Sequence, residues 1–391
     1  MSLLGIDFGT SYCAAAYFDA AAHPTPVAFG TNQFNGKYYK TPTVIQYAIT
    51  PNNDEIKIIG EIALSNLIQS NNSNSAIISK IKTELHERNG YIINGKPKLS
   101  VEVVSDILQY IKQVSEEQSN TIFEDVIITH PAQYELGRKK IIHDAAIRAG
   151  FENVFLVEEP IAAAYAFIDK YKIEKGKGAI VFDYGGGTID VAYLWYDENY
   201  KIQFKFEPES RSQCGGEYID ILFHNHISKI IDGNVSKHIS PVLLNLCTKT
   251  KINFTDSVCE NIAFQNKALK IDRSSFENII QPKVGIAIAA LESIVKTCES
   301  NHLPVDYVML NGGSSRLNIV LNSIKKLLPD AEVLDFKGDD LAVALGSILF
   351  YSDKIGKAQY ENDVTQVSHT VRGINRRLEA IRESYKKQLK K

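Results

Sequence analysis

Two segments of the chain read alike, and this internal repeat limits the possible folds more than any other feature. The first is LLGIDFGTSYCAAAYF at residues 3–18, and the second is AIVFDYGGGTIDVAYLW at residues 179–195. Each is an apolar β-rich run, an Asp-x-Gly corner and a second apolar run, which predicts a strand, a tight turn and a strand. Asp7 and Asp183 occupy equivalent places in the two copies.

A second pair of segments repeats as well. Residues 158–167, EEPIAAAYAF, and residues 339–350, DDLAVALGSILF, each predict a helix that begins with acidic residues and continues with small ones. Acidic side chains near a helix N-terminus are favoured by the helix dipole. The small side chains allow each helix to approach another backbone closely. Together the repeats predict an α/β protein with two similar lobes that face each other across a cleft.

The glycine corner of the second copy is suited to binding phosphate. Gly185, Gly186 and Gly187 have no Cβ, so their backbone N–H groups can point at an anion without obstruction. Two such corners facing each other would hold a triphosphate from both sides. Hydroxyl donors are available at the corners from Thr10, Ser11 and Thr188.

The aspartates of the two corners predict a magnesium site. Magnesium keeps several waters and takes few protein carboxylates, so Asp7 and Asp183 are placed to hold a hydrated ion. No GKS or GKT follows the glycines, which excludes a Walker A loop, and the strand that follows excludes a dinucleotide fingerprint. The alternative, that the glycines serve only tight turns with positive φ, stays open, but two matched corners that each carry Asp favour phosphate.

Charge and cysteine content narrow the partners and the location. The 391-residue chain has a net charge of −3, which gives no general reason to expect nucleic acid. We find no stretch that approaches the ~20 apolar residues of a membrane span, so we expect no membrane role. The five cysteines are far apart and form no CxxC pair, and the first strand begins almost at Met1. These features predict a protein of the reducing cytoplasm.

The C-terminal segment, residues 361–391, differs from the rest in charge. From Val371 to Lys391 there are eight Lys or Arg against two Glu, and apolar residues recur every three or four positions from Val364 to Tyr385. This spacing predicts a helix. It leaves open a helix folded back onto the acidic remainder of the chain, a coiled-coil or partner-binding helix at residues 364–391, and contact with a membrane surface or nucleic acid.

Six segments can be compared with known families. They are GIDFGTSYC, VIITHPAQYELGRKKIIHDAAIRAGFENVFLVEEPIAAAYAF, VFDYGGGTIDVAYL, CGGEYID, IDRSSFENII and VMLNGGSSRL. In this order they resemble the ATPase domain of the heat-shock-70 chaperone family, and the resemblance covers about residues 2–355. It implies the duplicated ribonuclease-H-like, actin-like fold, in which two five-stranded mixed sheets flanked by helices enclose a central nucleotide cleft.

The resemblance implies two phosphate loops with their metal ions. Asp7 and Asp183 match residues that bind magnesium through water, and Asp190 matches a carboxylate near a bound potassium ion. Thr188 would contact the γ-phosphate. The loops match at Thr10, Ser11 and Tyr12 in the first and at Gly185, Gly186, Gly187 and Thr188 in the second.

The resemblance also implies a catalytic pair. Glu159 matches the glutamate beside the attacking water, the alternative being a residue next to a helix N-cap. Lys80 best matches the lysine that stabilises charge on the γ-phosphate, with Lys82 as the alternative register and a solvated lysine as the other reading. The catalytic set implied is Lys80, Glu159, Asp183, Thr188 and Asp7.

A nucleoside site between two walls is implied as well. Arg316 would stack its guanidinium plane on adenine. Lys251 and Thr255, four residues apart on a predicted helix, would share one face and contact the adenosine. Asp340 fits the second small-residue helix. The walls match at Gly215, Gly216 and Glu217 on one side and at Gly312, Gly313 and Ser314 on the other.

The chain departs from the family pattern at several points. Thr248 stands where the family usually has a glutamate, which weakens one ribose contact. Pro131 matches the proline of the family's relay, but the partner arginine position holds Lys139, with Arg138 beside it, and this exchange is not neutral. Only some forty residues follow about Ser352, so we expect a basic helix in place of a peptide-binding domain.

These observations define the expected domains. Lobe I is expected at residues 1–172 with a return segment at 340–360. Lobe II is expected at 173–339, with a mobile helical upper subdomain at 217–285, and the basic tail occupies 361–391.

The function expected is that of a cytoplasmic, slowly hydrolysing, chaperone-like ATPase. It would bind ATP or ADP with magnesium and potassium, and a protein partner through the tail or the lobes, but no nucleic acid or membrane. Three alternatives remain: a nucleotide-dependent regulatory module with little turnover, an actin-like filament-forming ATPase, and a sugar or carboxylate kinase on the same fold.

Overall fold

The computed structural model describes residues 2–32, 36–52, 54–69, 76–85, 90–198, 201–232, 239–336 and 340–355. The predicted tail helix at 364–391 lies outside the described residues. The chain divides into two compact units, residues 1–348 and 349–391. Both larger sheets and the site described below belong to the first unit. The lobe bounds predicted from the sequence stay a prediction.

The first of the two larger sheets has six strands. They are β1 (Leu3–Phe8), β2 (Tyr12–Phe18), β3 (Pro24–Pro26), β6 (Lys40–Pro42), β12 (Asp125–His130) and β13 (Asn153–Glu158). Their order is β13-β12-β1-β2-β3, and β6 also pairs with β2. Strands β1 and β2 form the antiparallel hairpin predicted from the first sequence repeat, in which Asp7 lies opposite Ala14.

The second sheet also has six strands. They are β14 (Lys177–Tyr184), β15 (Thr188–Tyr196), β16 (Ile202–Phe204), β17 (Glu209–Ser212), β20 (Tyr307–Asn311) and β21 (Glu332–Asp335). Their order is β16-β15-β14-β20-β21, and β17 also pairs with β15. The hairpin of β14 and β15 corresponds to the second sequence repeat and sets Asp183 opposite Asp190.

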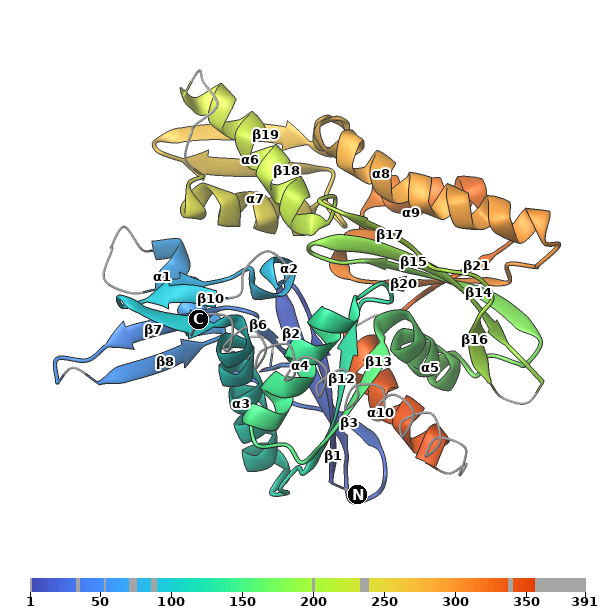
Figure 1. Cartoon of the computed structure of the whole chain (residues 1–391). Coiled ribbons are helices and arrows are strands. Elements are labelled where there is room, and N and C mark those ends of the chain that lie inside the picture. The colour runs from blue at the N-terminus through green and yellow to red at the C-terminus, as the bar shows by residue number, and fades with distance from the viewer. Residues whose placement is uncertain are drawn as a thin grey trace, which may run out of the picture. The chain divides into compact units, whose positions relative to one another are not determined.

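The two sheets have the same topology, so the repeat in the sequence corresponds to a repeat in the structure. In each, the first strand is antiparallel to the second and parallel to the third member of the core, as β1 is to β2 and β12, and β14 is to β15 and β20. The extra strands β6 and β17 both pair with the second strand of their hairpin. This confirms the predicted fold class, with six strands in each sheet instead of five (Figure 1).

The helices follow the same duplicated order. In the first half α3 precedes β12, α4 connects β12 to β13 and α5 follows β13, while α8, α9 and α10 hold the matching places around β20 and β21. Their bounds are α3 (Ser100–Ser119), α4 (Leu136–Arg148), α5 (Glu159–Tyr171), α8 (Arg273–Ser300), α9 (Asn318–Leu327) and α10 (Ala342–Ile355).

Each half also carries its own insertion. The first half inserts β4 (Gly30–Asn32), β5 (Gly36–Tyr38), β7 (Ile45–Ile49), β8 (Glu55–Ile59), α1 (Glu61–Gln69), β9 (Ala76–Ile78), α2 (Ile81–Glu84), β10 (Gly90–Ile93) and β11 (Lys96–Leu99). The second half inserts α6 (Gly216–Asp232), α7 (Pro241–Asn253), β18 (Cys259–Phe264) and β19 (Lys267–Asp272). The region 217–285, predicted to be helical, therefore also contains the antiparallel hairpin β18–β19.

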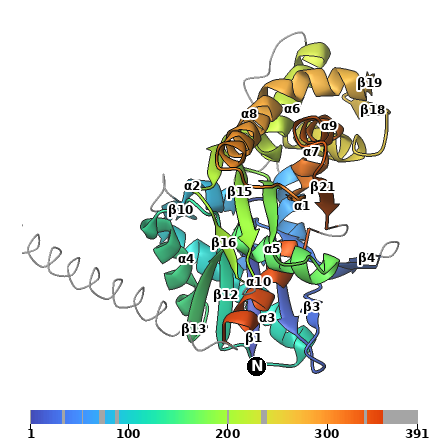
Figure 2. The ribbon, with the colours of Figure 1, turned by 90° about the vertical axis from the view of Figure 1, so that its right-hand side faces the viewer.

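Small residues bring α5 and α10 together, as the sequence predicts. A Cβ added at Gly346 would overlap with the carbonyl oxygen of Ala162, so the two helices cross at backbone contact distance. The two helices lie side by side in Figures 1 and 2, and α5 contacts strands of both larger sheets. A Cβ at Gly5 would meet Ser347 in the same way, which places β1 directly against α10. These contacts fix the two hairpins relative to each other.

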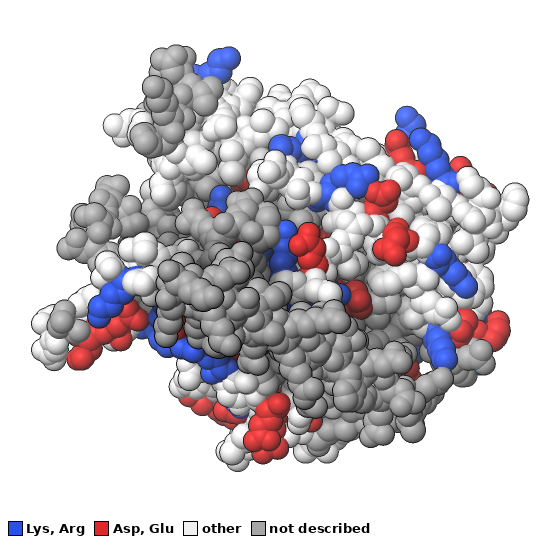
Figure 3. Space-filling model, in the orientation of Figure 1, with Lys and Arg blue, Asp and Glu red and all other residues white. Residues whose placement is uncertain are grey.

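Helix α8 differs from one expectation. By length and composition it could cross a membrane, so the prediction that no segment reaches this threshold was wrong. Its apolar residues recur on one face, however, and Phe276, Ile280, Val284 and Leu291 are buried in the core that it shares with the second sheet. We therefore interpret α8 as a core helix. On the face shown in Figure 3, acidic and basic side chains of the described residues are interspersed.

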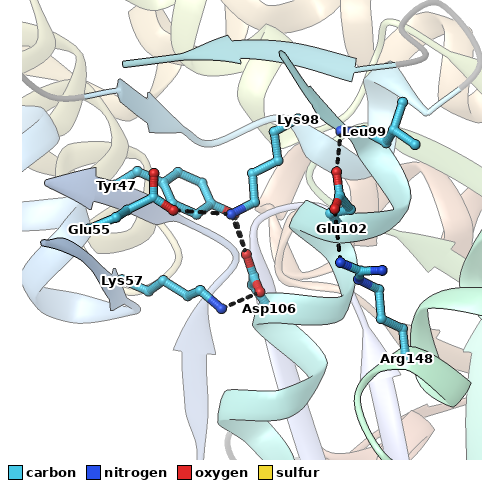
Figure 4. Close-up of polar contacts among 8 residues, drawn as sticks. All are labelled: Tyr47, Glu55, Lys57, Lys98, Leu99, Glu102, Asp106 and Arg148. Atoms are coloured by element: carbon cyan, nitrogen blue, oxygen red, sulfur yellow. Dashed lines mark hydrogen bonds and ion pairs between the residues drawn. The ribbon is translucent and has the colours of Figure 1, made fainter. Parts of the chain in front are cut away.

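The inserted sheet of β7, β8 and β9 is attached to α3 through Asp106 (Figure 4). Tyr47 donates to Oδ2 of Asp106 at 2.7 Å, and Lys57 donates to Oδ1 at 2.6 Å. Lys98 lies 3.1 Å from the same carboxylate and over the ring of Tyr47. Burial alone would raise the pKa of Asp106, but these hydrogen bonds outweigh it and hold the pKa below its ordinary value.

Replacing Asp106 with Asn should therefore destabilise the fold. The variant keeps the side-chain volume but removes the charge that three donors share, so we expect the free energy of unfolding to fall by about 2 kcal/mol. Urea unfolding followed by circular dichroism measures this change. The matched control is Asp169→Asn, whose partner Lys172 is exposed, and its effect should stay within about 0.5 kcal/mol. Equal effects of the two changes would contradict this account.

Candidate functional site

A pocket of about 130 Å³ lies where the two glycine corners meet. It is polar, with carboxylates contributed by both halves of the fold and two lysines by the first half. Its lining comprises Asp7, Gly9, Thr10, Ser11, Tyr12, Ala14, Lys40, Lys82, Glu159, Asp183, Gly185, Gly186, Thr188, Asn311, Gly312, Gly313, Asp340 and Val343. All predicted phosphate-loop residues except Gly187 thus line one pocket, although they come from segments about 180 positions apart.

The first corner is fixed by a threonine from a neighbouring segment. Thr43 donates its hydroxyl to the carbonyl of Gly9 at 2.9 Å and its backbone N–H to the carbonyl of Ser11 at 2.9 Å. The two bonds hold the turn between β1 and β2 in one conformation. Asp7, the next-to-last residue of β1, accepts a hydrogen bond from Thr129 of β12 at 3.3 Å.

The second corner uses its glycines for close approach, and not for positive φ. None of Gly185, Gly186 and Gly187 has a positive φ, so the tight-turn alternative does not account for them. A Cβ added at Gly186 would overlap with the hydroxyl of Ser11, which belongs to the first corner. A Cβ at Gly215 would overlap with the carbonyl of Gly186. The glycines are therefore needed because three loops meet here without side chains between them.

Carboxylates of the site resist ionisation because water is excluded from them. Burial, followed by the charge of Glu159, raises the pKa of Asp7 above its ordinary value. Burial, Glu159 and Asp190 raise the pKa of Asp183 in the same direction. The pKa of Asp190 is raised to about 6, again mainly by burial, although Thr188 donates to its Oδ2 at 3.1 Å. A positive charge placed here would relieve this repulsion.

Lys82 lies beside Glu159, and Lys80 does not. Nζ of Lys82 donates to Oε1 of Glu159 at 2.6 Å, and both side chains are buried. Burial alone would lower the pKa of Lys82, but the carboxylate of Glu159 outweighs this and raises it. Lys80 precedes α2 and is exposed, because the one-turn helix begins at Ile81 and turns Ile81 and Lys82 inward. The alternative register named in the sequence analysis is the one found beside Glu159.

The donor set of the site suits a hydrated cation better than a directly ligated one. Among the described residues, no three His, Cys, Asp or Glu side chains are grouped to hold a metal ion. Asp7 and Asp183 nevertheless face the pocket from two strands, and Oδ1 of Asp190 is buried without a hydrogen-bond partner in the described part of the chain. Buried carboxylates with raised pKa values and one unsatisfied oxygen fit a cation that keeps its waters.

The predicted first wall of the nucleoside site lies directly against the second corner. The N–H groups of Gly216 and Glu217 donate to the carbonyls of Gly185 and Gly186, both at 2.9 Å. Ser11 donates to Oε1 of Glu217 at 3.0 Å. The start of α6 is therefore hydrogen-bonded to both corners, and Glu217 is a link between the two halves of the fold.

Lys251 and Thr255 are not arranged as predicted. Helix α7 ends at Asn253, so Thr255 is past its end, and the hydroxyl of Thr255 bonds the carbonyl of Ile252 at 2.8 Å. The prediction that the pair shares one helical face was wrong. Lys251 donates to the carbonyl of Gly216 at 3.0 Å.

Asp220 is the partner that sequence reasoning missed on this wall. It is buried on α6 and accepts hydrogen bonds from Lys251 and Thr248, each at 2.9 Å. Thr248 occupies the position where the family usually has a glutamate. In this chain, therefore, a carboxylate from α6 holds the lysine of α7.

The opposite wall is an ion-pair chain. Arg316 of the short helix η1 (Gly313–Arg316) donates to Oδ1 of Asp335 at 2.9 Å and also to Asp340. Lys40 of β6 lies 3.0 Å from Oδ2 of Asp340. Lys40 and Asp340 line the pocket, whereas Arg316 does not. Lys40 and Asn311 are pocket residues that sequence reasoning missed, and three hundred positions separate Lys40 from Asp340.

The Lys82–Glu159 pair predicts an asymmetry between two lysines. Lys82→Met would leave Glu159 buried without its partner, and we expect the free energy of unfolding to fall by about 3 kcal/mol in the absence of nucleotide. Lys80→Met, a change of the same kind at an exposed position, should alter it by less than about 0.5 kcal/mol. Urea unfolding of the two variants and the parent protein measures these changes in the free energy of unfolding. Equal losses, or a larger loss for Lys80→Met, would contradict the assignment of the ion pair.

Comparison with known proteins gives a consistent result. A family model described as "Hsp70 protein" matches residues 3–368. The chain is 26% identical over 369 residues to the chaperone protein DnaK of Ureaplasma urealyticum serovar 10, a match that covers 89% of this chain and 58% of the relative. It is 29% identical over 340 residues to DnaK of Endomicrobium trichonymphae, with 81% and 52% covered.

A second kind of relative matches over a shorter range. The chaperone protein HscA homolog of Acinetobacter baumannii is 24% identical over 290 residues, covering 72% of this chain and 46% of the relative. The chain spans about half the length of the curated relatives that it matches.

Proposed function

The chain belongs to the Hsp70 protein family, and from this premise we propose that it binds ATP and ADP and hydrolyses ATP slowly, as a chaperone-like ATPase. One observation carries the proposal. The two glycine corners bring Asp7, Asp183, Lys82 and Glu159 together around a single polar pocket. Buried carboxylates and a lysine between two glycine loops are a suitable environment for a polyphosphate with its cation.

The residues of the pocket take distinct roles in this proposal. Glu159 holds and orients the attacking water and accepts its proton, and Lys82, now in place of Lys80, stabilises charge on the γ-phosphate. Thr188 contacts the γ-phosphate. The water oxygen forms a bond to the γ-phosphorus, the bond to the bridging oxygen breaks, and ADP and inorganic phosphate result. Thr10, Ser11, Tyr12 and the glycines of the second corner hold the remaining phosphates.

Magnesium and potassium belong to the proposal as well. Asp7 and Asp183 would hold magnesium through water, and the ion would supply positive charge against the phosphate oxygens. Asp190, with its unpaired oxygen, is the residue that would lie near potassium. The raised pKa values of all three carboxylates support a cation requirement, since each is ionised more readily beside positive charge.

The nucleoside would lie between the two walls beyond the pocket. Gly215, Gly216 and Glu217 form one wall, which Lys251 supports. Gly312, Gly313 and Ser314 form the other, together with Arg316 and Asp340. We propose that Arg316 keeps its bonds to Asp335 and Asp340 while it stacks on adenine, because a guanidinium plane can donate along its edge and stack on its face.

The cellular location and the binding partner are part of the same proposal. We place the protein in the cytoplasm, with nucleotide-dependent binding of a protein partner through the lobes or through residues 364–391. The relatives named above are chaperones, which supports a protein partner more than nucleic acid or a membrane.

Glu159→Gln tests the proposed reaction. The amide cannot accept the proton from water, so we expect single-turnover hydrolysis of ATP to slow by 100-fold or more, while calorimetry gives ATP and ADP affinities within about threefold of the parent. The matched control is Glu158→Gln, the adjacent residue, which lies 4.0 Å from Lys139 and is not in the pocket lining. Glu158→Gln should hydrolyse ATP at the parent rate. Unchanged turnover in Glu159→Gln would overturn the role of Glu159.

The same measurements separate the remaining functions. Binding of ATP and ADP without hydrolysis by the parent protein would favour a nucleotide-dependent regulatory module. Sedimentation of the protein on addition of ATP would favour an actin-like filament.

A further inference from the structure

A second pocket adjoins the first and has a different character. It measures about 480 Å³, and Thr10, Lys82 and Thr188 line both pockets. These three residues surround the place where the first pocket would hold a γ-phosphate. The second pocket therefore begins where the leaving phosphate would be produced. A volume of this size accommodates a phosphate ion with waters around it, since a water occupies about 30 Å³ in the liquid.

The lining of this second pocket is cationic and rich in donors. Lys80, Lys82 and Arg138 face a single acidic residue, Glu84, which accepts a hydrogen bond from Tyr91 at 3.1 Å. The first pocket is the reverse, with more carboxylates than lysines. The remaining lining is Thr10, Thr83, Pro131, Gln133, Tyr134, Gly187, Thr188, Ser210, Ser212, Gln213 and Tyr218. Charge thus changes sign along the path from one pocket to the next.

Arg138 contributes the guanidinium group of this second pocket. Its Nε is buried and has no hydrogen-bond partner among the described residues. Its guanidinium carbon lies 5.0 Å from the ring centre of Tyr134, so one face of the group is packed. Tyr134 in turn donates its hydroxyl to the carbonyl of Lys82 at 3.2 Å. Arg138 as a whole is half-buried and lines the second pocket, so its guanidinium is available to an anion there.

The walls of the pocket come from both halves of the fold. Arg138 lies on α4 of the first half, while Ser210 and Ser212 lie on β17 of the second. Gln133 joins the two sides by donating to the carbonyl of Pro208 at 2.5 Å. The pocket is thus lined by elements of both halves.

We propose that this second pocket is an anion site for inorganic phosphate, held by Arg138 with Lys80, through which the product leaves after hydrolysis. The inference rests on the proposed function, because it assigns a destination to one of its products. Phosphate moves away from the carboxylates of the first pocket toward a cationic chamber. ADP is retained by the glycine corners while the phosphate is held separately.

Arg138→Met tests the site, with Arg148→Met as the matched control on the same helix. Arg148 is exposed and bonds Glu102, at the opposite end of α4. With the protein saturated with ADP and magnesium, ³¹P NMR titration of inorganic phosphate should give a dissociation constant about tenfold weaker in Arg138→Met and unchanged in Arg148→Met. Arg138→Lys, which keeps the charge but loses the planar donors, should fall between them.

The rate of phosphate release tests whether this pocket lies on the path by which the product leaves. In a single turnover, acid quench measures hydrolysis and a fluorescent phosphate-binding sensor measures release. Release should be about tenfold faster in Arg138→Met, with the hydrolysis rate and the affinity for ATP unchanged. Thermal unfolding confirms that each variant is folded.

Three outcomes would overturn the proposal. One is a phosphate affinity in Arg138→Met equal to that of the parent. Another is an equal loss of phosphate and ATP affinity, because Arg138 would then belong to the nucleotide site. The last is a parent protein that binds no phosphate up to about 10 mM, the highest concentration in the titration, at which even a weak product site would be occupied. A parent that neither binds nor hydrolyses ATP would instead refute the proposed function, and the NMR titration of phosphate distinguishes the two failures.

Discussion

Repulsion between buried carboxylates governs the centre of this structure. Asp7 of β1, Asp183 of β14 and Asp190 of β15 have pKa values raised first by burial and then by the charge of Glu159 on α5. Lys82 is the buried ammonium beside Glu159. Lys82 and Lys40 do not balance all of these acids, so burying the carboxylates is costly to the folded state. The site persists because each carboxylate is carried on an element whose apolar side chains are packed in a core. A site arranged in this way is stabilised most by a ligand that brings positive charge with it.

The duplicated frame and its insertions contribute different chemistry. The frame supplies the aspartates, since Asp7 and Asp183 occupy matching positions in two sheets of the same topology. The insertions differ between the halves and supply the groups that make the site asymmetric. Helix α2 in the first insertion provides Lys82, and α6 in the second provides Glu217, which Ser11 joins to the first corner. A symmetric pair of hairpins thereby becomes an asymmetric pocket, as the proposed separation of phosphate and nucleoside requires.

Local sequence patterns were enough to predict the duplicated frame. Features that depend on long-range packing could not be predicted from them. The alternation of apolar residues around each Asp-x-Gly corner is enough to predict both hairpins, because strand period and glycine turns are local. The choice between Lys80 and Lys82 depends on where a one-turn helix begins, and such a helix has no periodicity. The extra strands β6 and β17 have three and four residues and little burial pattern, so nothing in the sequence marks them. Lys40 and Asp340 are three hundred positions apart in the sequence, and only the tertiary fold brings them together.

Helix α8 gives a second example in which composition alone does not predict the structural role of a segment. Composition alone gives it the length and hydropathy of a membrane span, whereas the positions of its buried residues show one face in a protein core.

Lys82 lies between the two pockets, and this position bears on the proposed order of hydrolysis and phosphate release. Lys82 lines both pockets and bonds Glu159 at 2.6 Å. A phosphate between the pockets would compete with Glu159 for this ammonium, so the ion pair must weaken while phosphate stays there. Once Arg138 and Lys80 hold the phosphate, Lys82 is free to return to Glu159. In the cycle we propose, departure of the product into the second pocket would restore the ion pair, which is the contact between α2 and α5 seen in the structure.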